Sequence, residues 1–277
     1  MLNKRNRIIS KCVTYILLVC FSIYCIFPFV WMVISALKPK TEIRTATPTF
    51  FIHAPTLENF QRVLFDAGFL KYIKNSLFVS VVACVLSMII AVMAGYALSR
   101  YYKLKVVKAS NLAMMLSQMI PGVLLLVPLY LIMQKLRILE SYKSLILAYT
   151  TFVIPLCTFM MSSFFDTVPL ALEEAAEIDG CNKAQTIFKV ILPLSLPSLV
   201  STGLYAFINE FMFGYIFIST DQYRTLTPAI MLFKGVNTVD WGGLMAGSVV
   251  AVIPVTLIFL FLQRYFLAGL MSGSVKG

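Results

Sequence analysis

Charged and catalytic side chains are scarce in this 277-residue sequence. Only 13% of its residues are Asp, Glu, Lys or Arg, and its single histidine is His53. A Ser/His/Asp or Cys/His catalytic arrangement has no candidate beyond that isolated residue. No Gly-rich phosphate loop of the GxxxxGK[ST] type is present either. The sequence therefore argues against an enzyme and against a chain that binds ATP in the usual way.

Cysteine spacing gives no sign of a metal site or of a disulfide framework. The six cysteines lie inside apolar stretches or in one acidic loop, so we interpret them as small hydrophobic residues. They are Cys12, Cys20, Cys25, Cys84, Cys157 and Cys181. The sequence also lacks internal repeats, low-complexity segments and any stretch typical of a soluble domain.

Long apolar segments dominate what is present. Hydrophobic residues make up 60% of the chain, and its mean hydropathy is +0.87. A membrane-spanning helix needs about 20 predominantly apolar residues. Uncharged runs of that length predict six spans, with both termini on one side, at residues 12–37, 75–99, 109–134, 144–165, 190–209 and 241–263.

The net charge of +11 fits a membrane topology better than a nucleic-acid partner. The basic residues are scattered at the ends of the predicted spans, not gathered in a stripe that could follow a phosphate backbone. Lipid is therefore the expected surrounding of this chain, and nucleic acid is excluded as a partner.

Two acid-free basic clusters predict the orientation. Residues 1–11 carry four basic side chains, and residues 100–108 carry four more. Lys and Arg counted over all loops are nearly balanced, but clusters near the first spans dominate orientation. We therefore expect both termini and the loops 100–108 and 166–197 to be cytoplasmic. The first apolar stretch is too long for a signal peptide, so we expect it to stay as the first span.

Two of the predicted spans contain polar or helix-breaking residues. The third holds Gln118 and Pro121-Gly122, and a broken helix at that depth is tolerated only against protein or a water-filled cavity. The fifth, placed at Leu199–Ser219, holds Asn209 and Glu210 near mid-membrane. A carboxylate there costs about 2.5–3.5 kcal/mol on insertion scales unless it faces a cavity or a partner. A role in the translocation path and a packing role against another subunit both remain open.

The most polar segment is 166–197, for which the residues predict a helical hairpin. Good helix formers fill Leu170–Ile178, with Pro169 suited to the first turn and Asp166 or Thr167 as the expected cap. Gly180 suits a left-handed residue that ends the helix.

Asn182 is expected to cap a second short helix that runs to about Val190. Pro193 and Pro197 are expected to end it.

This hairpin carries a recognisable spacing. Glu174-Ala175-Ala176, then Gly180, Val190 and Leu192-Pro193 resemble the cytoplasmic loop of permease subunits of ATP-driven (ABC) importers. That family usually has Ile where Val190 stands. An amphipathic hairpin lying on the membrane is the alternative, but such helices favour Lys and Arg on their polar face, whereas this one carries carboxylates.

Motifs outside the hairpin resemble the carbohydrate-uptake branch of that family. They are Pro55–Phe60, Asp240-Trp241-Gly242, Gln263–Phe266 and the tail Gly269–Gly277. Many relatives have Trp-Asn-Glu where this chain has Ile208-Asn209-Glu210, which leaves no stacking role at 208. The resemblance covers nearly the whole chain, and it is most specific over 70–277.

The resemblance implies an all-α, six-helix permease of the type I ABC importer fold, similar to the smaller permease of maltose transporters. Expected partners are a second homologous permease, two ATPase subunits that bind ATP and Mg, and an extracytoplasmic solute-binding protein. The expected segments are 1–69 (tail, first span, external segment), 70–264 (transmembrane core) and 265–277 (cytoplasmic tail). Other readings are a permease for glycerol phosphate or another polyol, or a stand-alone secondary transporter.

The resemblance and the residue types together give three sets of candidate site residues. For ATPase coupling they are Glu173, Glu174, Ala175, Ala176, Asp179, Gly180, Leu192 and Pro193. For the translocation path they are Gln118, Asn209 and Glu210, and for contact with the binding protein they are Tyr223, Arg224 and Trp241. No catalytic, metal-binding or cofactor-binding residue is expected in this chain.

Overall fold

The computed structural model describes residues 4–45, 47–208, 212–235 and 238–274. In these ranges the regular secondary structure is helical, apart from one isolated β-bridge between Lys234 and Val239. The chain divides into two compact units, which are described separately. The first comprises residues 1–70 and 230–252, and the second comprises residues 71–229 and 253–277.

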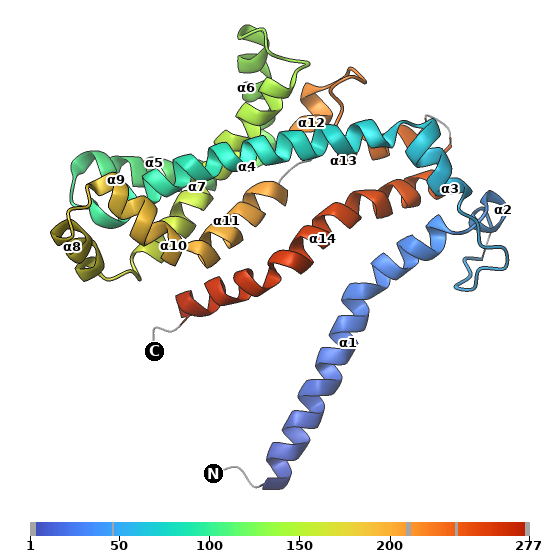
Figure 1. Cartoon of the computed structure of the whole chain (residues 1–277). Coiled ribbons are helices and arrows are strands. Elements are labelled where there is room, and N and C mark those ends of the chain that lie inside the picture. The colour runs from blue at the N-terminus through green and yellow to red at the C-terminus, as the bar shows by residue number, and fades with distance from the viewer. Residues whose placement is uncertain (1–3, 46, 209–211, 236–237, 275–277) are drawn as a thin grey trace. The chain divides into compact units, whose positions relative to one another are not determined.

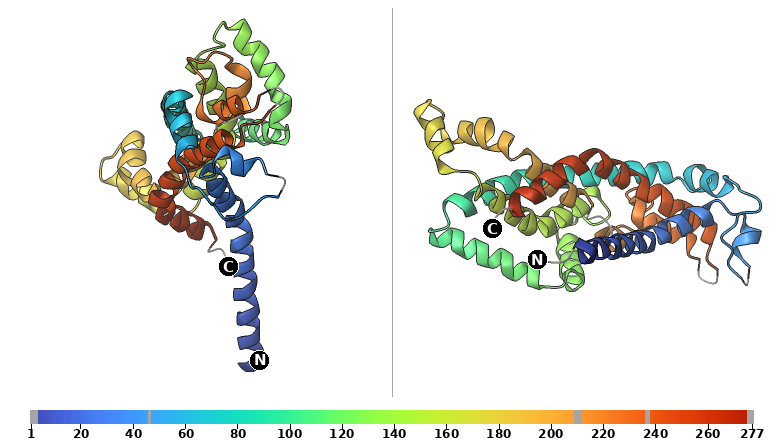
Figure 2. Two further views of the ribbon diagram at one scale, coloured as in Figure 1. Left: turned by 90° about the vertical axis from the view of Figure 1, so that its right-hand side faces the viewer. Right: turned by 90° about the horizontal axis from the view of Figure 1, so that it is seen from below.

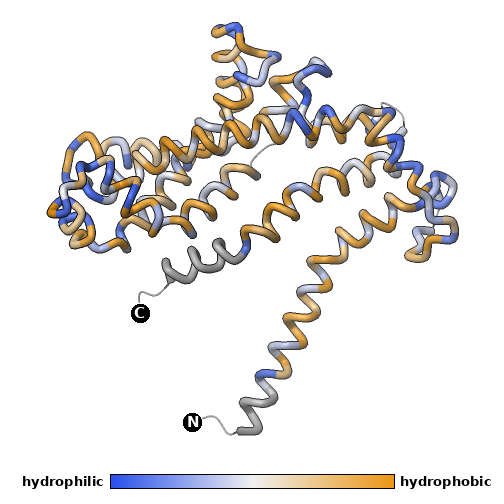
Figure 3. The backbone as a smooth tube through the Cα atoms, in the orientation of Figure 1, coloured by the Kyte–Doolittle hydropathy of each residue, from blue (hydrophilic) through white to orange (hydrophobic). Residues whose placement is uncertain are grey.

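Within the described residues, four helices are long and apolar enough to cross a membrane, and they match four of the predicted spans. They are α1 (Lys4–Ala36), α4 (Phe69–Arg100), α7 (Tyr142–Phe165) and α14 (Trp241–Ser274), whose apolar stretches are Ser10–Ala36, Phe69–Arg100, Tyr142–Phe165 and Trp241–Gln263. Their hydrophobic character is visible along the tube in Figure 3.

The other two predicted spans are present only if each of two bent pairs of helices is counted as one membrane span. The chain bends by 107° between helix α5 (Lys105–Met119) and helix α6 (Gly122–Lys135), and the bend is visible in Figure 2. Pro121 occupies the cap position just before α6, where its missing N–H removes no hydrogen bond within the helix, and Ile120 is extended. This confirms the predicted break in the third span.

The chain bends just before the fifth span, close to the two prolines expected to end the preceding helix. Residues 183–194 bend by 83° against 196–207. Helix α11 (Leu196–Ile208) is then followed by α12 (Met212–Phe217). Asn209 and Glu210, the predicted intramembrane polar pair, lie outside the described residues.

In the first unit, Asn59 fastens the start of the external segment to the end of α1. Its amide nitrogen donates to the carbonyls of Ala36 (2.9 Å) and Lys38 (2.8 Å). A Cβ at Gly242 would come within 2.5 Å of the Asn59 side-chain oxygen, so only glycine fits there. Arg62 of η1 (Arg62–Asp66) pairs with Asp240 at 2.8 Å.

The short helices of this unit complete its framework. They are α2 (Lys40–Ile43), α3 (Glu58–Gln61) and η3 (Ile230–Phe233), while α13 (Leu226–Ala229) belongs to the second unit.

In the second unit, α4, α7 and α11 pack into one core. Gly95 lets α4 approach α7 closely, since a Cβ there would lie 2.8 Å from the Met161 Cβ. Phe213 of α12 contacts the rings of Tyr149 and Phe152 on α7, with centroids 5.6 and 5.9 Å away. Helix α7 is accordingly the most buried of the long apolar helices in the described part of the chain, with 56% of its most apolar window buried.

Candidate functional site

The hairpin forms as predicted at its first helix and its turn. Helix α8 spans Leu170–Ile178, and Gly180 follows with φ +84°, a conformation that L side chains rarely adopt. Asn182 caps α9 (Lys183–Thr186) in a reciprocal capping box with Gln185, with both hydrogen bonds at 2.9 Å. Figure 1 shows the hairpin beside the C-terminal end of α4.

The predicted cap of α8 was wrong. Pro169 occupies the cap position without a side-chain hydrogen bond. The backbone N–H of Asp166 still completes the last turn of α7, and its carboxylate accepts a hydrogen bond from Ser99 at 2.6 Å. Thr167 donates to the Phe164 carbonyl instead. Both residues therefore close the end of α7.

The second helix runs past its predicted end near Val190 and ends at Leu194, between the two prolines expected to end it. The chain widens into the π-helical turn η2 (Ile187–Ile191) and continues through α10 (Leu192–Leu194), which contains that proline. A wider turn relieves the clash between a proline ring and the preceding turn. The helix breaks at Ser195, and Pro197 lies in the first turn of α11.

Glu173 lies inside the hairpin and not on its surface. Only 7% of the residue is exposed, and its carboxylate accepts hydrogen bonds from Arg100 Nε and from the Tyr96 hydroxyl, both at 2.6 Å. Arg100 also donates to the Val168 carbonyl at 2.9 Å, just before α8. We call Tyr96, Arg100 and Glu173 the latch, because they tie α8 to the end of α4.

The latch changes the expected roles of two residues. Glu173 and Ala176 (6% exposed) face inward, so neither presents its side chain to a partner. Burial of every third or fourth residue is the ordinary pattern of a helix packed on one side. The sequence did not reveal Arg100 and Tyr96 as partners of Glu173 because both lie more than 70 positions before it. The one sequence signal was the charge of Arg100 at the end of a long apolar helix.

The outer face of the hairpin combines acidic and apolar side chains. Glu174, Ala175 and Asp179 are exposed, Pro193 is exposed and Leu192 is half-buried. Ile178 is 86% exposed and Phe188 is 69% exposed. The chain itself therefore leaves these two apolar side chains uncovered.

Gln118 is exposed in the last turn of α5, directly before the break at Pro121. Its place in the translocation path stays a prediction, as do the roles of Asn209 and Glu210.

Two carboxylates clamp the loop 219–226 to the rest of the second unit. Glu140 accepts hydrogen bonds from the backbone N–H groups of Ser219 (2.8 Å) and Thr220 (2.9 Å). Asp221 accepts from Lys71 (2.6 Å) and from the Tyr72 hydroxyl.

The predicted binding-protein residues of this loop are engaged inside the chain. Arg224 donates to the Asp221 carboxylate (3.0 Å) and to the Ser219 carbonyl (2.8 Å). Tyr223 packs edge-on against Tyr142, with ring centroids 4.9 Å apart. Trp241, in the first unit, is 49% exposed. Of the three, Trp241 is therefore the side chain that offers a free aromatic surface.

Acid is expected to open this clamp. Burial alone would raise the pKa of Glu140, but hydrogen bonds from Thr220 and Ser219 outweigh it and lower that pKa. The hydrogen bonds from Lys71 and Tyr72 lower the pKa of Asp221. A lowered carboxyl pKa contributes stability above the ordinary values of 4.5 and 3.8, and this is lost as pH falls through the folded-state pKa.

The measurement is amide hydrogen exchange at Ser219 and Thr220, corrected for the intrinsic effect of pH. Protection should be constant near neutral pH and should fall in acid, and Glu140→Gln should remove most of it at neutral pH. Protection that is equal at pH 7 and pH 3 would contradict a carboxylate clamp.

Among the described residues, no three His, Cys, Asp or Glu side chains gather in a way that could hold a metal ion. The candidate site is thus a latched hairpin between membrane helices, with an outer face that the chain itself leaves uncovered. A family model described as "Binding-protein-dependent transport system inner membrane component" matches residues 87–271, which include the whole hairpin.

The chain belongs to this family. It is 37% identical over 260 residues to the sulfoquinovosyl glycerol transport system permease protein SmoH of Agrobacterium fabrum, covering 91% of this chain and 89% of that one. It is 34% identical over 284 residues to the trehalose/maltose transport system permease protein MalG of Thermococcus litoralis, covering 99% of each.

The fold agrees with this membership. A chain of a bacterial ABC transporter involved in the import of the acidic polysaccharide alginate superposes with a TM-score of 0.80, over 96% of this chain and 99% of that one. The two are 21% identical, so the likeness concerns the fold. The protein is accordingly a multi-pass membrane permease of a binding-protein-dependent transport system, and the expected all-helical ABC importer permease fold is confirmed.

Proposed function

We propose that this permease imports a sugar, an oligosaccharide or a related glycoside across the cytoplasmic membrane. The observation that carries the proposal is the near full-length similarity to permeases named for a sulfoquinovosyl glycerol and for trehalose and maltose. The carbohydrate-branch motifs at Asp240-Trp241-Gly242 and Gln263–Phe266 support it. A glycerol phosphate or another polyol is the alternative cargo, and a stand-alone secondary transporter does not fit a binding-protein-dependent family.

The energy for transport comes from separate subunits in this proposal. The chain has no phosphate loop of the GxxxxGK[ST] type, so two ABC ATPase subunits hold the ATP and Mg. A second homologous permease completes the membrane part, and an extracytoplasmic solute-binding protein delivers the cargo. Trp241, exposed and aromatic, suits contact with that protein, since aromatic anchors dominate such interfaces.

The hairpin is the proposed point at which ATP hydrolysis acts on this subunit. Glu174, Ala175 and Asp179 on its outer face, with Ile178 and Phe188, offer the surface on which an ATPase subunit seats. The latch then passes a displacement of α8 to the end of α4, because Arg100 is bonded both to Glu173 and to the Val168 carbonyl. ATP and cargo bias the same two-state element, as linkage requires.

The basic clusters at residues 1–11 and 100–108 support an orientation in which residues 166–197 and both termini are cytoplasmic. Gln185 lies on the hairpin and is half-buried, with its side chain in the capping box. A cysteine at position 185 should react with a membrane-impermeant maleimide only after the cells are opened. Labelling from outside intact cells would overturn the proposed topology.

The cargo is tested by uptake and by ATPase stimulation with a panel of solutes. Cells that carry the complete transporter, and matched cells lacking this permease, are offered disaccharides, glycosides and glycerol 3-phosphate. Uptake of a carbohydrate that depends on the permease is the expected result. Permease-dependent uptake of glycerol 3-phosphate, with no carbohydrate transported, would replace the proposal with the alternative cargo.

A further inference from the structure

The register of α1 in the membrane can be estimated from its own sequence. Lys11 is the last charge before the apolar run. The hydrocarbon core takes about 20 helical residues, so counted from Cys12 it ends near Trp31. The most apolar window of α1 contains no buried residue, so its surface is free to contact lipid. Trp31 fits this register because tryptophan is enriched at membrane–water interfaces.

The segment 47–52 folds back along α1 toward that level. The Phe50 ring lies 5.0 Å from the Trp31 ring and 6.0 Å from the Phe27 ring, measured between centroids. Phe27 precedes the end of α1 at Ala36 by nine residues, or about 13 Å at 1.5 Å per residue. Phe50 therefore lies beside the boundary of the hydrocarbon core and not out in solvent.

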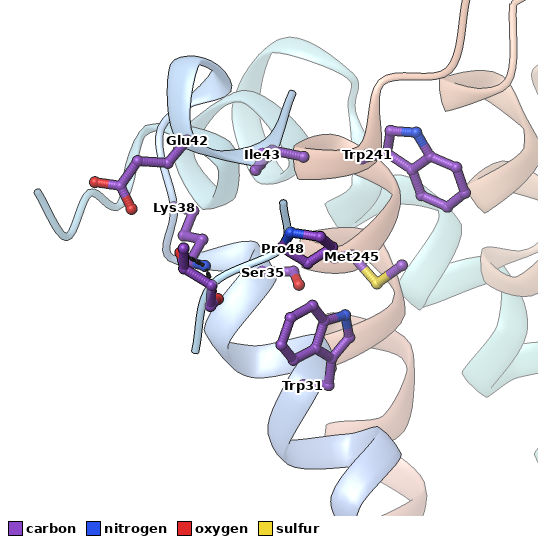
Figure 4. A pocket seen from close by; sticks show the side chains of 9 residues that line it. Trp31, Ser35, Lys38, Glu42, Ile43, Pro48, Trp241 and Met245 are labelled. Carbon is purple, nitrogen blue, oxygen red and sulfur yellow. Dashed lines mark hydrogen bonds between the residues drawn. The ribbon is translucent and has the colours of Figure 1, made fainter. Parts of the chain in front are cut away.

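A built contact holds the segment in this position. Lys38, only 4% exposed, donates from Nζ to the carbonyl and to the hydroxyl (3.0 Å) of Thr49, one residue before Phe50. The ammonium also lies 5.7 Å from the centre of the Trp31 ring. Figure 4 shows Lys38 and Pro48 on the same side of the Trp31 ring. The segment thus has a defined depth along α1.

At that depth the segment leaves large apolar side chains bare. Phe51 is 80% exposed and Phe50 is 58% exposed. Two bare phenylalanines in water are unfavourable at roughly 25 cal/mol per Å² of apolar surface, but they suit the headgroup–acyl boundary, where interfacial segments bury about 5–10 Å deep. The exposed face is also continuous with the apolar surface of α1, against which Phe50 packs.

We infer that residues 47–52 form a membrane-inserted loop, with Phe50 and Phe51 held by α1 and Lys38 at the hydrocarbon boundary of the lipid bilayer. The partner of this surface is phospholipid. The loop acts as an interfacial anchor that fixes the depth of the end of α1. The inference depends neither on the cargo nor on which side of the membrane the loop faces.

The test places an environment-sensitive fluorophore at position 51. Phe51→Cys is labelled with an NBD maleimide in the complete transporter, reconstituted into vesicles of phosphatidylethanolamine and phosphatidylglycerol. The matched control is Lys40→Cys, an exposed position on α2 of the same external segment, and the unsubstituted chain serves as the blank for native cysteines. Quenching is measured with nitroxide-bearing lipids and with aqueous iodide.

The expected result at position 51 is blue-shifted emission that nitroxide lipids quench several-fold more strongly than at position 40, with weak iodide quenching. Two outcomes would overturn the inference. Iodide quenching at 51 equal to that at 40 would place the loop in water. Blue-shifted emission that neither iodide nor nitroxide lipids quench would show that a protein subunit covers it.

Discussion

Replacing Arg100 by alanine is expected to abolish transport almost completely. The side chains of Arg100 and Glu173 are only 10% and 9% exposed, and their atoms approach to 2.6 Å. Removing one partner of a buried ion pair leaves an uncompensated charge and costs about 3–5 kcal/mol. Because the same guanidinium also holds the Val168 carbonyl, the start of α8 would come free of α4.

The hairpin also carries an ion pair that is exposed to solvent, and this pair provides the matched control. Lys183 and Glu177 approach to 3.0 Å, but their side chains are 66% and 47% exposed. Surface pairs contribute little to stability, so Lys183→Ala should transport like the unsubstituted protein. The two variants remove one cation each from the hairpin region and differ in whether the remaining carboxylate is buried.

A double variant separates two effects of Arg100→Ala: the unpaired charge left on Glu173, and the loss of the contact between α8 and α4. Arg100→Met with Glu173→Leu removes both charges and fills the site with apolar groups, which is often neutral for stability. We expect this chain to assemble with its partners but to hydrolyse more ATP for each molecule transported. Arg100→Ala that transports normally, or a double variant with an unchanged ratio of transport to hydrolysis, would contradict the role of the latch.

Local sequence signals predicted much of the hairpin. The bounds of α8, the left-handed Gly180 and the cap at Asn182 all follow from residues within a few positions of one another. Such features depend on backbone conformation and short-range hydrogen bonds, which a sequence states directly. The prediction of long apolar spans succeeded for a similar reason, because length and composition alone decide it.

The remaining features depend on contacts that local preference does not reveal. Glu173 reads as one more surface carboxylate until Arg100 and Tyr96, far away in sequence, are brought beside it. Pro193 reads as a helix stop, but a π-helical turn accommodates it. Tyr223 and Arg224 read as exposed loop residues, yet Tyr142 and Asp221 engage them. The partners of Glu173 and Tyr223 lie far away in the sequence, whereas the π-helical turn directly precedes α10 and Asp221 is three residues from Arg224.

Replacing Gly180 by valine is expected to uncouple the permease from its ATPase subunits. Gly180 has φ +84°, which other side chains resist by about 1–2 kcal/mol per residue. A Cβ at this position meets nothing within 4 Å, so the strain is conformational and not steric. The turn should shift α8 relative to α9 and displace Glu174 and Ile178 on the outer face.

Gly68 is a natural control for this variant. It also has a positive φ, +69°, and a Cβ there also meets nothing within 4 Å, but it lies before α4 and outside the hairpin. Gly68→Val should therefore carry a similar backbone strain without altering the proposed ATPase contact. If Gly180→Val lowers transport and Gly68→Val does not, the loss is due to where the backbone strain lies and not to how large it is.

The most direct test of the coupling hairpin measures ATPase co-purification and carbohydrate uptake together. The variants are Gly180→Val, Gly68→Val and Glu174→Lys, which reverses an exposed charge on the outer face. The account predicts that Gly180→Val and Glu174→Lys lose most of the uptake and most of the attached ATPase, while Gly68→Val keeps both and the binding protein still binds its sugar. Normal uptake with full ATPase attachment in both hairpin variants would contradict the claim that this hairpin couples ATP hydrolysis to transport.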